Sequence, residues 1–344
     1  MMEQCTGDLV VYAGLGAIFL FVLVAPFVSR GVEKNLEPFL FIMGLAAVLL
    51  TGDLTLDLLR TALVEPLPIS LAVLITGFLF YLGKDWLTKA TSCVSRQIPP
   101  AVLHFLIVVI LGLSASIITA IIASLVLVEV ILLLNLDRKN RVVLSVLACF
   151  AISLGAVLTP LGEPLSAIAS ARLKVDFFYL MRLLGLYLIP GIFFIAFLAA
   201  LCVGATRKQG AAFQRAGMDI KEVIPRAFRV YIFIMALIFL GEGFRPLIDR
   251  YVVPQDSRIL YWINMISAVL DNATLAAAEL TPSMNRQQVS GCLMGLLLSG
   301  GMLIPGNIPN IITASRLQIA SSEWARVGIP LGLGLMIFYY VILF

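Results

Sequence analysis

Long apolar segments follow one another through almost the whole chain, and they constrain the fold more than any other feature. Ten of them can be recognised, beginning at Leu9, Pro38, Leu67, Ala101, Val142, Phe177, Val230, Ile259, Val289 and Val327. About 20 apolar residues suffice for a helix to cross a membrane. The chain is 61% hydrophobic and 13% charged, whereas a soluble domain is about 45–50% apolar and about 25% charged. The sequence therefore predicts an all-α polytopic membrane protein with one integral membrane domain over residues 1–344.

The charged residues indicate how such a chain is oriented. Lys and Arg are about twice as frequent in one set of connecting segments as in the opposite set, the richer set being 29–37, 84–100, 135–141, 204–229 and 321–326. Because basic loops stay on the cytoplasmic side, we expect both termini outside. The net charge of +4 then reflects loop bias, so we expect a lipid bilayer and no nucleic acid as partner.

Motifs of enzymes and of ATP-driven transport are absent from the sequence. The single histidine, His104, excludes an H-E-x-x-H metalloprotease, and there is no P-loop. The five cysteines are scattered without C-x-x-C spacing, which argues against disulfides and a metal cluster. We therefore expect no enzyme and no cofactor, and energy from ion gradients or from a partner.

An internal repeat divides most of the chain into two halves. The segment ASIITAIIASLVLVEVI (115–131) aligns with MISAVLDNATLAAAELT (265–281). At matched spacing, GAVLTPLGEPLSAIASARL (155–173) aligns with GGMLIPGNIPNIITASRL (300–317), with one residue of slip before the shared Arg-Leu. In the predicted topology the two copies have opposite orientations, and inverted repeats with broken helices are typical of secondary transporters.

The repeat suggests boundaries for the parts of the chain. Residues 1–66 are expected to form N-terminal scaffold helices, 67–203 the first inverted-topology repeat, and 226–344 the second. Each repeat is predicted to contain a re-entrant hairpin and a discontinuous, unwound transmembrane helix.

Proline pairs mark the predicted breaks. In the alignment Pro160 lies over Pro305, and Pro164 over Pro309. Because proline lacks a backbone donor and clashes one turn back, each pair should unwind about one turn of helix. The freed carbonyls are tolerated only where they are buried in protein or line a watery cavity, and they suit a cation. The alternative is a pair of simple proline kinks.

Carboxylates, amides and hydroxyls cluster near these breaks. Asp271, Asn272 and Thr274 fall within one turn, and Asp271 shares a helical face with Thr274. In the first copy the corresponding stretch carries Thr119 and Ser124. Asp271 needs a partner, a proton or an ion, because an ionisable group at mid-membrane costs about 2.5–3.5 kcal/mol.

Further acidic and amide residues accompany the breaks. Glu163 lies between Gly162 and Pro164, and Asn307 and Asn310 flank Ile308, its partner in the alignment. These residues are candidate ion ligands.

Two more acids, Glu129 and Glu279, align with each other near the ends of their segments. They could carry a proton or a coupling ion. The alternative is that they snorkel or form a hydrogen bond between helices.

At SAVLDNATLAAAE and GAVLTPLGEPLSAIA the chain resembles the ion transporter superfamily. In that superfamily a hairpin with a D-N-x-T or S-N-T tip is paired with an unwound T-x-x-G-x-P-x-N turn in each inverted half. The D-N-x-T form resembles the NhaD-type sodium/proton antiporters. The whole chain also resembles an uncharacterised bacterial and archaeal family described as cation transporters, which implies the inner, cytoplasmic membrane of a prokaryote.

The resemblance implies roles for individual residues. Asp271, Asn272 and Thr274 would form the second hairpin tip, with Asn307 and Asn310 in the second unwound turn. Thr159 and Glu163 would form the first unwound turn. The first hairpin reads IITAIIAS, so only one half carries the full motif. Elevator-type relatives use their first helices as a scaffold, which is consistent with a homodimer.

These features predict a secondary active cation transporter, most directly a sodium/proton antiporter working by alternating access. Asp271 and Glu163 would bind sodium and protons in competition, so the sodium ion and the proton are the only bound species expected. The alternative is a sodium-coupled carboxylate or oxyanion transporter, in which half-helix N-termini at Leu165 and Asn310 hold the anion. A third alternative, an accessory subunit without transport, does not explain paired breaks with buried acids.

Overall fold

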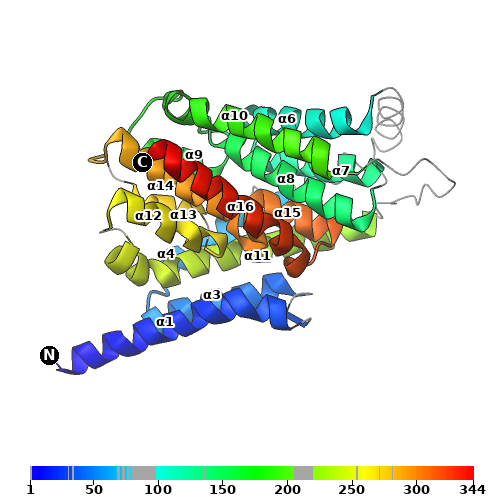
Figure 1. The fold of residues 1–344 in the computed structure, drawn as a ribbon. Coiled ribbons are helices and arrows are strands. Elements are labelled where there is room, and N and C mark those ends of the chain that lie inside the picture. Colours follow the sequence, from blue (N-terminus) through cyan, green and yellow to red (C-terminus); the bar gives the residue numbers. More distant parts are fainter. Residues whose placement is uncertain are drawn as a thin grey trace.

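The computed structural model describes residues 2–29, 31–32, 35–67, 70–71, 74–75, 78, 98–134, 136–204, 220–252, 255–270, 272–280 and 282–344. Within these ranges the chain is helical, with no strand (Figure 1). A helix satisfies its backbone donors and acceptors within one segment, which the hydrocarbon core of a membrane requires.

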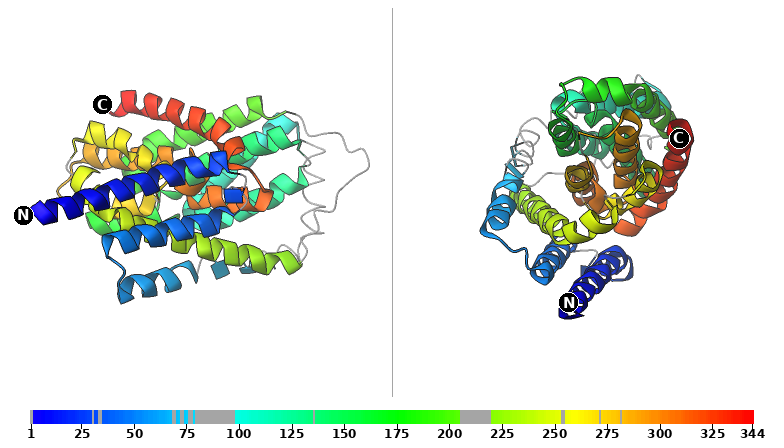
Figure 2. Two further views of the ribbon diagram at one scale, coloured as in Figure 1. Left: turned by 90° about the horizontal axis from the view of Figure 1, so that it is seen from below. Right: turned by 90° about the vertical axis from the view of Figure 1, so that its left-hand side faces the viewer.

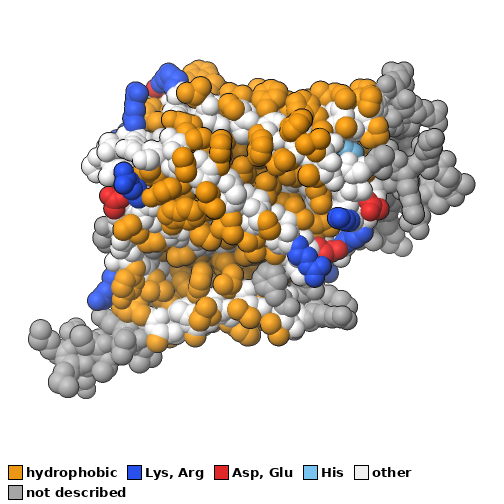
Figure 3. All heavy atoms as spheres, viewed as in Figure 1, with side chains coloured by type: hydrophobic (Ala, Val, Ile, Leu, Met, Phe, Trp, Pro, Cys, Tyr) orange, Lys and Arg blue, Asp and Glu red, His pale blue; other side chains and the backbone are white. Residues whose placement is uncertain are grey.

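Five helices of the described ranges are long and apolar enough to cross a membrane. They are α6 (Pro100–Ile118), α8 (Arg138–Ala156), α10 (Tyr179–Cys202), α16 (Ser321–Leu343) and the part Ala227–Leu247 of α11 (Ile220–Leu247). Hydrophobic side chains cover the middle of the molecular face, and charged ones gather toward the two ends of the helices (Figure 3). The chain is thus an integral membrane protein.

Three N-terminal helices lie along one side of the molecule. They are α1 (Met2–Val28), α3 (Leu36–Thr51) and α4 (Leu56–Val64), and α11 lies between them and the remaining helices (Figures 1 and 2). Glycines allow α3 and α11 to approach closely. A Cβ on Gly44 would lie 2.8 Å from the carbonyl oxygen of Ala236, and one on Gly243 would lie 2.6 Å from Cβ of Ala47. Small residues at a helix interface are typical of packing in membranes.

Shorter helices occupy the remainder of the described chain. They are α7 (Ala120–Leu133), α9 (Pro164–Leu173), α12 (Ser257–Ile263), α13 (Asn272–Glu279), α14 (Arg286–Gly300) and α15 (Ile308–Leu317), with the single turns η1 (Ile248–Val252), η2 (Asn264–Ala268) and η3 (Ile304–Gly306). A ten-residue helix such as α9 or α15 is about 15 Å long, half of the roughly 30 Å hydrocarbon core. Neither can cross a membrane alone.

Both proline pairs lie in or next to the stretches that separate two helices. Pro160 follows the end of α8, and Pro164 is the first residue of α9, a position at which the missing N–H is not needed. Pro305 lies in η3, and Pro309 is the second residue of α15. Irregular backbone therefore separates α8 from α9 and α14 from α15.

Contacts between distant residues show which helix ends lie together. Arg138 at the start of α8 donates to the carbonyl oxygens of Leu317 and Gln318 and pairs with Glu323 of α16. At the other end, Gln287 of α14 donates to the carbonyl of Leu343 (2.9 Å). Both chain termini lie at this same end of the bundle (Figure 1).

Candidate functional site

A cavity of about 260 Å³, called the polar cavity below because four polar side chains line it, lies where the two broken stretches meet. Its walls come from four separate parts of the chain: the turn between α6 and α7, the break before α9, the start of α13, and the break before α15. The lining residues are Thr119, Ala120, Ile121, Pro160, Leu161, Gly162, Glu163, Pro164, Ala167, Asn272, Ala273, Asn307, Ile308 and Pro309.

The turn between α6 and α7 consists of Thr119 alone, whose backbone has φ 75° and ψ 150°. L-amino acids avoid this region, and holding one there costs about 1–3 kcal/mol. Contacts to the first break hold the turn: Ala120 N–H donates to the carbonyl of Gly162 (2.8 Å), and the Thr159 hydroxyl donates to the carbonyl of Ser116. The hydrogen bond of Thr159 thus links this turn to the first break.

Glu163 is the carboxylate of this cavity. It is the N-cap of α9 and is only 6% exposed. The preceding Gly162 lies against the end of α8, since a Cβ there would be 1.9 Å from the carbonyl oxygen of Ala156. This close approach turns the chain back and places Glu163 at the cavity wall, at the positive end of α9.

Asn307 occupies the corresponding place in the second break. It is the N-cap of α15, and its φ of −156° equals that of Glu163. Its Nδ2 donates to the Ser153 hydroxyl of α8 (2.6 Å). Nearby, Nδ2 of Asn310 donates to the carbonyls of Gly300 and Leu303 (2.9 Å each), and its buried Oδ1 accepts no hydrogen bond.

The positions of helix ends, closely packed glycines and left-handed residues match the two breaks differently from the sequence alignment. The ends of α8 and α14, the closely packed Gly162 and Gly306, and the left-handed residues Lys174 and Gln318 all follow one constant spacing along the chain. That spacing matches Glu163 with Asn307, whereas aligning the prolines had matched Glu163 with Ile308. The alignment of the prolines differs from the structural match by one residue, because a break in a helix tolerates proline at more than one position.

The turn before α13, which the sequence analysis predicted as the second hairpin tip, is described only in part. Asn272 lines the cavity, is 4% exposed, and its Nδ2 has no hydrogen-bond partner. Asp271 lies outside the described residues, as does the side chain of Thr274. Ser124 is buried in α7, where its hydroxyl donates to the carbonyl of Ala120 (2.6 Å).

Glu129 lies away from the cavity, in contact with a buried arginine. Arg316 near the end of α15 donates to Oε1 of Glu129 of α7 (3.3 Å), and the two side chains are 4% and 14% exposed. The pair joins two helices far apart in the sequence. Sequence reasoning had not paired Arg316 with Glu129.

Removing the arginine of this pair should strongly destabilise the protein. A buried charge that loses its partner costs about 3–5 kcal/mol. We expect Arg316→Ala to lower the thermal unfolding temperature in detergent far more than Arg182→Ala does. Arg182 pairs with Asp176 on the surface, where side chains 63% and 60% exposed make a pair worth about 0–1 kcal/mol. Equal effects of the two variants would contradict this prediction.

Glu279 also lies away from the cavity, at the last residue of α13. It is 1% exposed and contacts Asn264 and Cys292, which are both fully buried. The sequence analysis missed Asn264, Cys292 and Ser153. A polar residue such as Asn264 within an apolar segment was a usable signal, since buried polar groups have partners.

The donor set of the polar cavity suits a small, hard cation. It comprises the Glu163 carboxylate, the amides of Asn272 and Asn307, and the Thr119 hydroxyl. The described residues contain no cluster of three or more His, Cys, Asp or Glu side chains that could hold a metal ion. Oxygen ligands with few charges are typical of alkali-metal ion sites in transporters.

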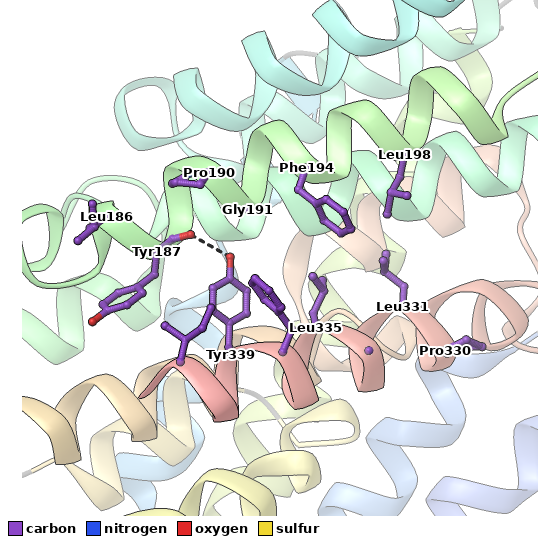
Figure 4. A pocket seen from close by; sticks show the side chains of 13 residues that line it. Leu186, Tyr187, Pro190, Gly191, Phe194, Leu198, Pro330, Leu331, Leu335 and Tyr339 are labelled. Atoms are coloured by element: carbon purple, nitrogen blue, oxygen red, sulfur yellow. Dashed lines mark hydrogen bonds between the residues drawn. The ribbon is translucent and has the colours of Figure 1, made fainter. Parts of the chain in front are cut away.

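A larger, apolar cavity of about 780 Å³ lies between α10 and α16 (Figure 4). Leu186, Phe194, Leu331 and Leu335 are among its lining residues, and the Tyr339 hydroxyl donates to the carbonyl of Tyr187 (2.9 Å). None of its lining residues is charged. It is therefore a poor ion site, and the smaller polar cavity is the better candidate.

A comparison with known protein families identifies the family to which the chain belongs. A family model described as protein of unknown function (DUF1646) matches residues 12–344. The chain belongs to the DUF1646 family. No curated protein matches it. For this DUF1646 protein, function must be argued from the site.

Proposed function

We propose that this DUF1646 protein is a secondary active cation transporter, and specifically a sodium/proton antiporter that works by alternating access. The observation that carries the proposal is the buried carboxylate of Glu163 in a cavity lined by both helix breaks. Broken helices that meet at one site are the usual architecture of an ion site in such transporters.

The proposal includes two inverted-topology repeats, each with a re-entrant hairpin and a discontinuous helix. Reciprocal packing supports it: α7 of the first half packs against α15 of the second, and α13 of the second packs against α9 of the first. Each short helix after a break is thus held by the hairpin arm of the other half. A small relative movement of the two halves would change access to the cavity between them.

Exchange follows from one site that binds either ion. Glu163, with Asp271 outside the described residues, would hold sodium when deprotonated, and a proton would displace sodium. The partners are then a small inorganic cation and the lipid bilayer, with no cofactor and no catalysis. Helices α1, α3 and α4 would be the scaffold and could carry a homodimer contact, and the membrane would be the inner membrane of a prokaryote.

The second candidate is a sodium-coupled carboxylate or oxyanion transporter. Residues at the start of α9 and α15 line the cavity, and helix N-termini attract anions. The cap of α9 is itself an acid, however, so Glu163 already neutralises that helix end and would repel a bound anion. This arrangement favours a cation.

Proton flux in proteoliposomes tests the proposal. With a pH dye inside, added sodium should evoke a pH change in the native protein, and Asp271→Asn should abolish it because the site loses a charged ligand. Asp57→Asn, the same substitution at an exposed acid of α4, is the control and should retain flux. A silent dye together with sodium-dependent uptake of a labelled carboxylate would instead support the anion transporter.

A further inference from the structure

Three buried polar side chains form a cluster apart from the cavity. Oε2 of Glu279 accepts a hydrogen bond from Nδ2 of Asn264 (2.9 Å) and another from the thiol of Cys292 (3.0 Å). The residues come from α13, η2 and α14, and none is more than 1% exposed. The carboxyl group is therefore buried inside the protein.

Glu279 forms no ion pair with any described residue. Among the charged groups on the elements packed against α13, Arg172 of α9, Arg286 of α14 and Arg229 of α11 are exposed. Arg250 of η1 stacks on two tyrosine rings, and Glu242 and Arg245 of α11 pair with each other. The side chains of Asp249, Lys221, Glu222 and Arg226 lie outside the described residues. Burying an unpaired carboxylate is far more costly than burying the neutral acid. The carboxyl group is therefore held best with a proton on it.

Two buried oxygens of this cluster lack a hydrogen-bond donor. Oε1 of Glu279 and Oδ1 of Asn264 are both buried, and neither accepts a hydrogen bond. A carboxylic acid and an amide pair through two parallel bonds, N–H to the acid carbonyl and O–H to the amide oxygen. The first of these bonds is present. A proton on Oε1 would provide the donor for the second.

We propose that Glu279 is a second proton-binding site of the exchange, separate from the cation cavity and linked to it through α13. This inference rests on the proposed function. Binding forms one O–H bond at Oε1, and release leaves the carboxylate and a free proton. Asn272 at the first residue of α13 lines the cavity, and Glu279 is the last residue of the same helix. Because both residues belong to the same eight-residue helix, cation binding at its start can change the surroundings of Glu279 at its end.

The variant Glu279→Gln tests the site without disturbing its shape. Glutamine reproduces the protonated acid, because its amide can donate to Oδ1 of Asn264 and its oxygen can accept from Nδ2. In the infrared difference spectrum of native protein minus Glu279→Gln at neutral pH, we expect the carbonyl band of a protonated carboxylic acid. Asn264→Leu should shift that band to higher frequency, because the acid carbonyl loses its donor. A spectrum that lacks the protonated band would overturn the proton site.

Flux and ion binding then separate this inference from the proposed function. Glu279→Gln should lose sodium-driven proton flux and keep radioactive sodium binding, whereas Asp271→Asn should lose sodium binding and keep the infrared band. Undiminished proton flux in Glu279→Gln would refute its role as proton carrier. If the native protein shows no sodium-driven flux, the antiport proposal fails, and the infrared band still decides whether Glu279 holds a proton.

Discussion

Replacing Glu163 with glutamine should abolish sodium-driven proton flux while the protein still folds. The side chain lies at the wall of the polar cavity and is the only carboxylate among its described lining residues. Glutamine has the same shape but no charge, and the matching position of the second break already carries the amide of Asn307. Loss of a charged ligand should weaken sodium binding at least about 100-fold, since even indirect partners of a metal site contribute about 10- to 100-fold.

Sodium titration of flux and of radioactive sodium binding checks this expectation. The matched control is Glu65→Gln, an exposed acid that follows α4. It should transport like the native protein, and both variants should unfold at similar temperatures. Native sodium affinity in Glu163→Gln would remove the cavity from consideration as the cation site.

Replacing Gly155 with alanine should strongly destabilise the protein. A Cβ at this position would lie 1.7 Å from the carbonyl oxygen of Gly112, at the contact between α6 and α8. That atom belongs to helix backbone, so the two helices must separate. Overpacking usually costs about 1–3 kcal/mol, and a clash with rigid backbone should reach or exceed the upper value.

Thermal unfolding of the purified protein in detergent measures this effect. Gly334→Ala in α16 is the control, because no atom lies within 4 Å of the added methyl group. It should be neutral or slightly stabilising, since alanine favours helix more than glycine does. If the two variants have the same unfolding temperature, the close contact of α6 and α8 at Gly112 and Gly155 is wrong.

Local sequence was sufficient to predict several features. Runs of apolar residues predicted the membrane helices, and the prolines marked the stretches between α8 and α9 and between α14 and α15. The polar motifs named Thr119, Glu163, Asn272 and Asn307, which together line one cavity. These predictions work because helix length, backbone donors and the cost of burying polar groups depend on a residue and its near neighbours.

Pairings between distant side chains depended on the tertiary structure. The acids Glu129 and Glu279 align in the sequence, yet one pairs with Arg316 and the other with Asn264 and Cys292. The match of Glu163 with Asn307 likewise emerged only from the positions of helix ends and close glycine contacts. The sequence by itself determined that apolar helices make up most of the chain and where irregular backbone interrupts them. Only the tertiary structure decided which polar groups meet, because helix packing sets the distance and direction between residues that the chain keeps far apart.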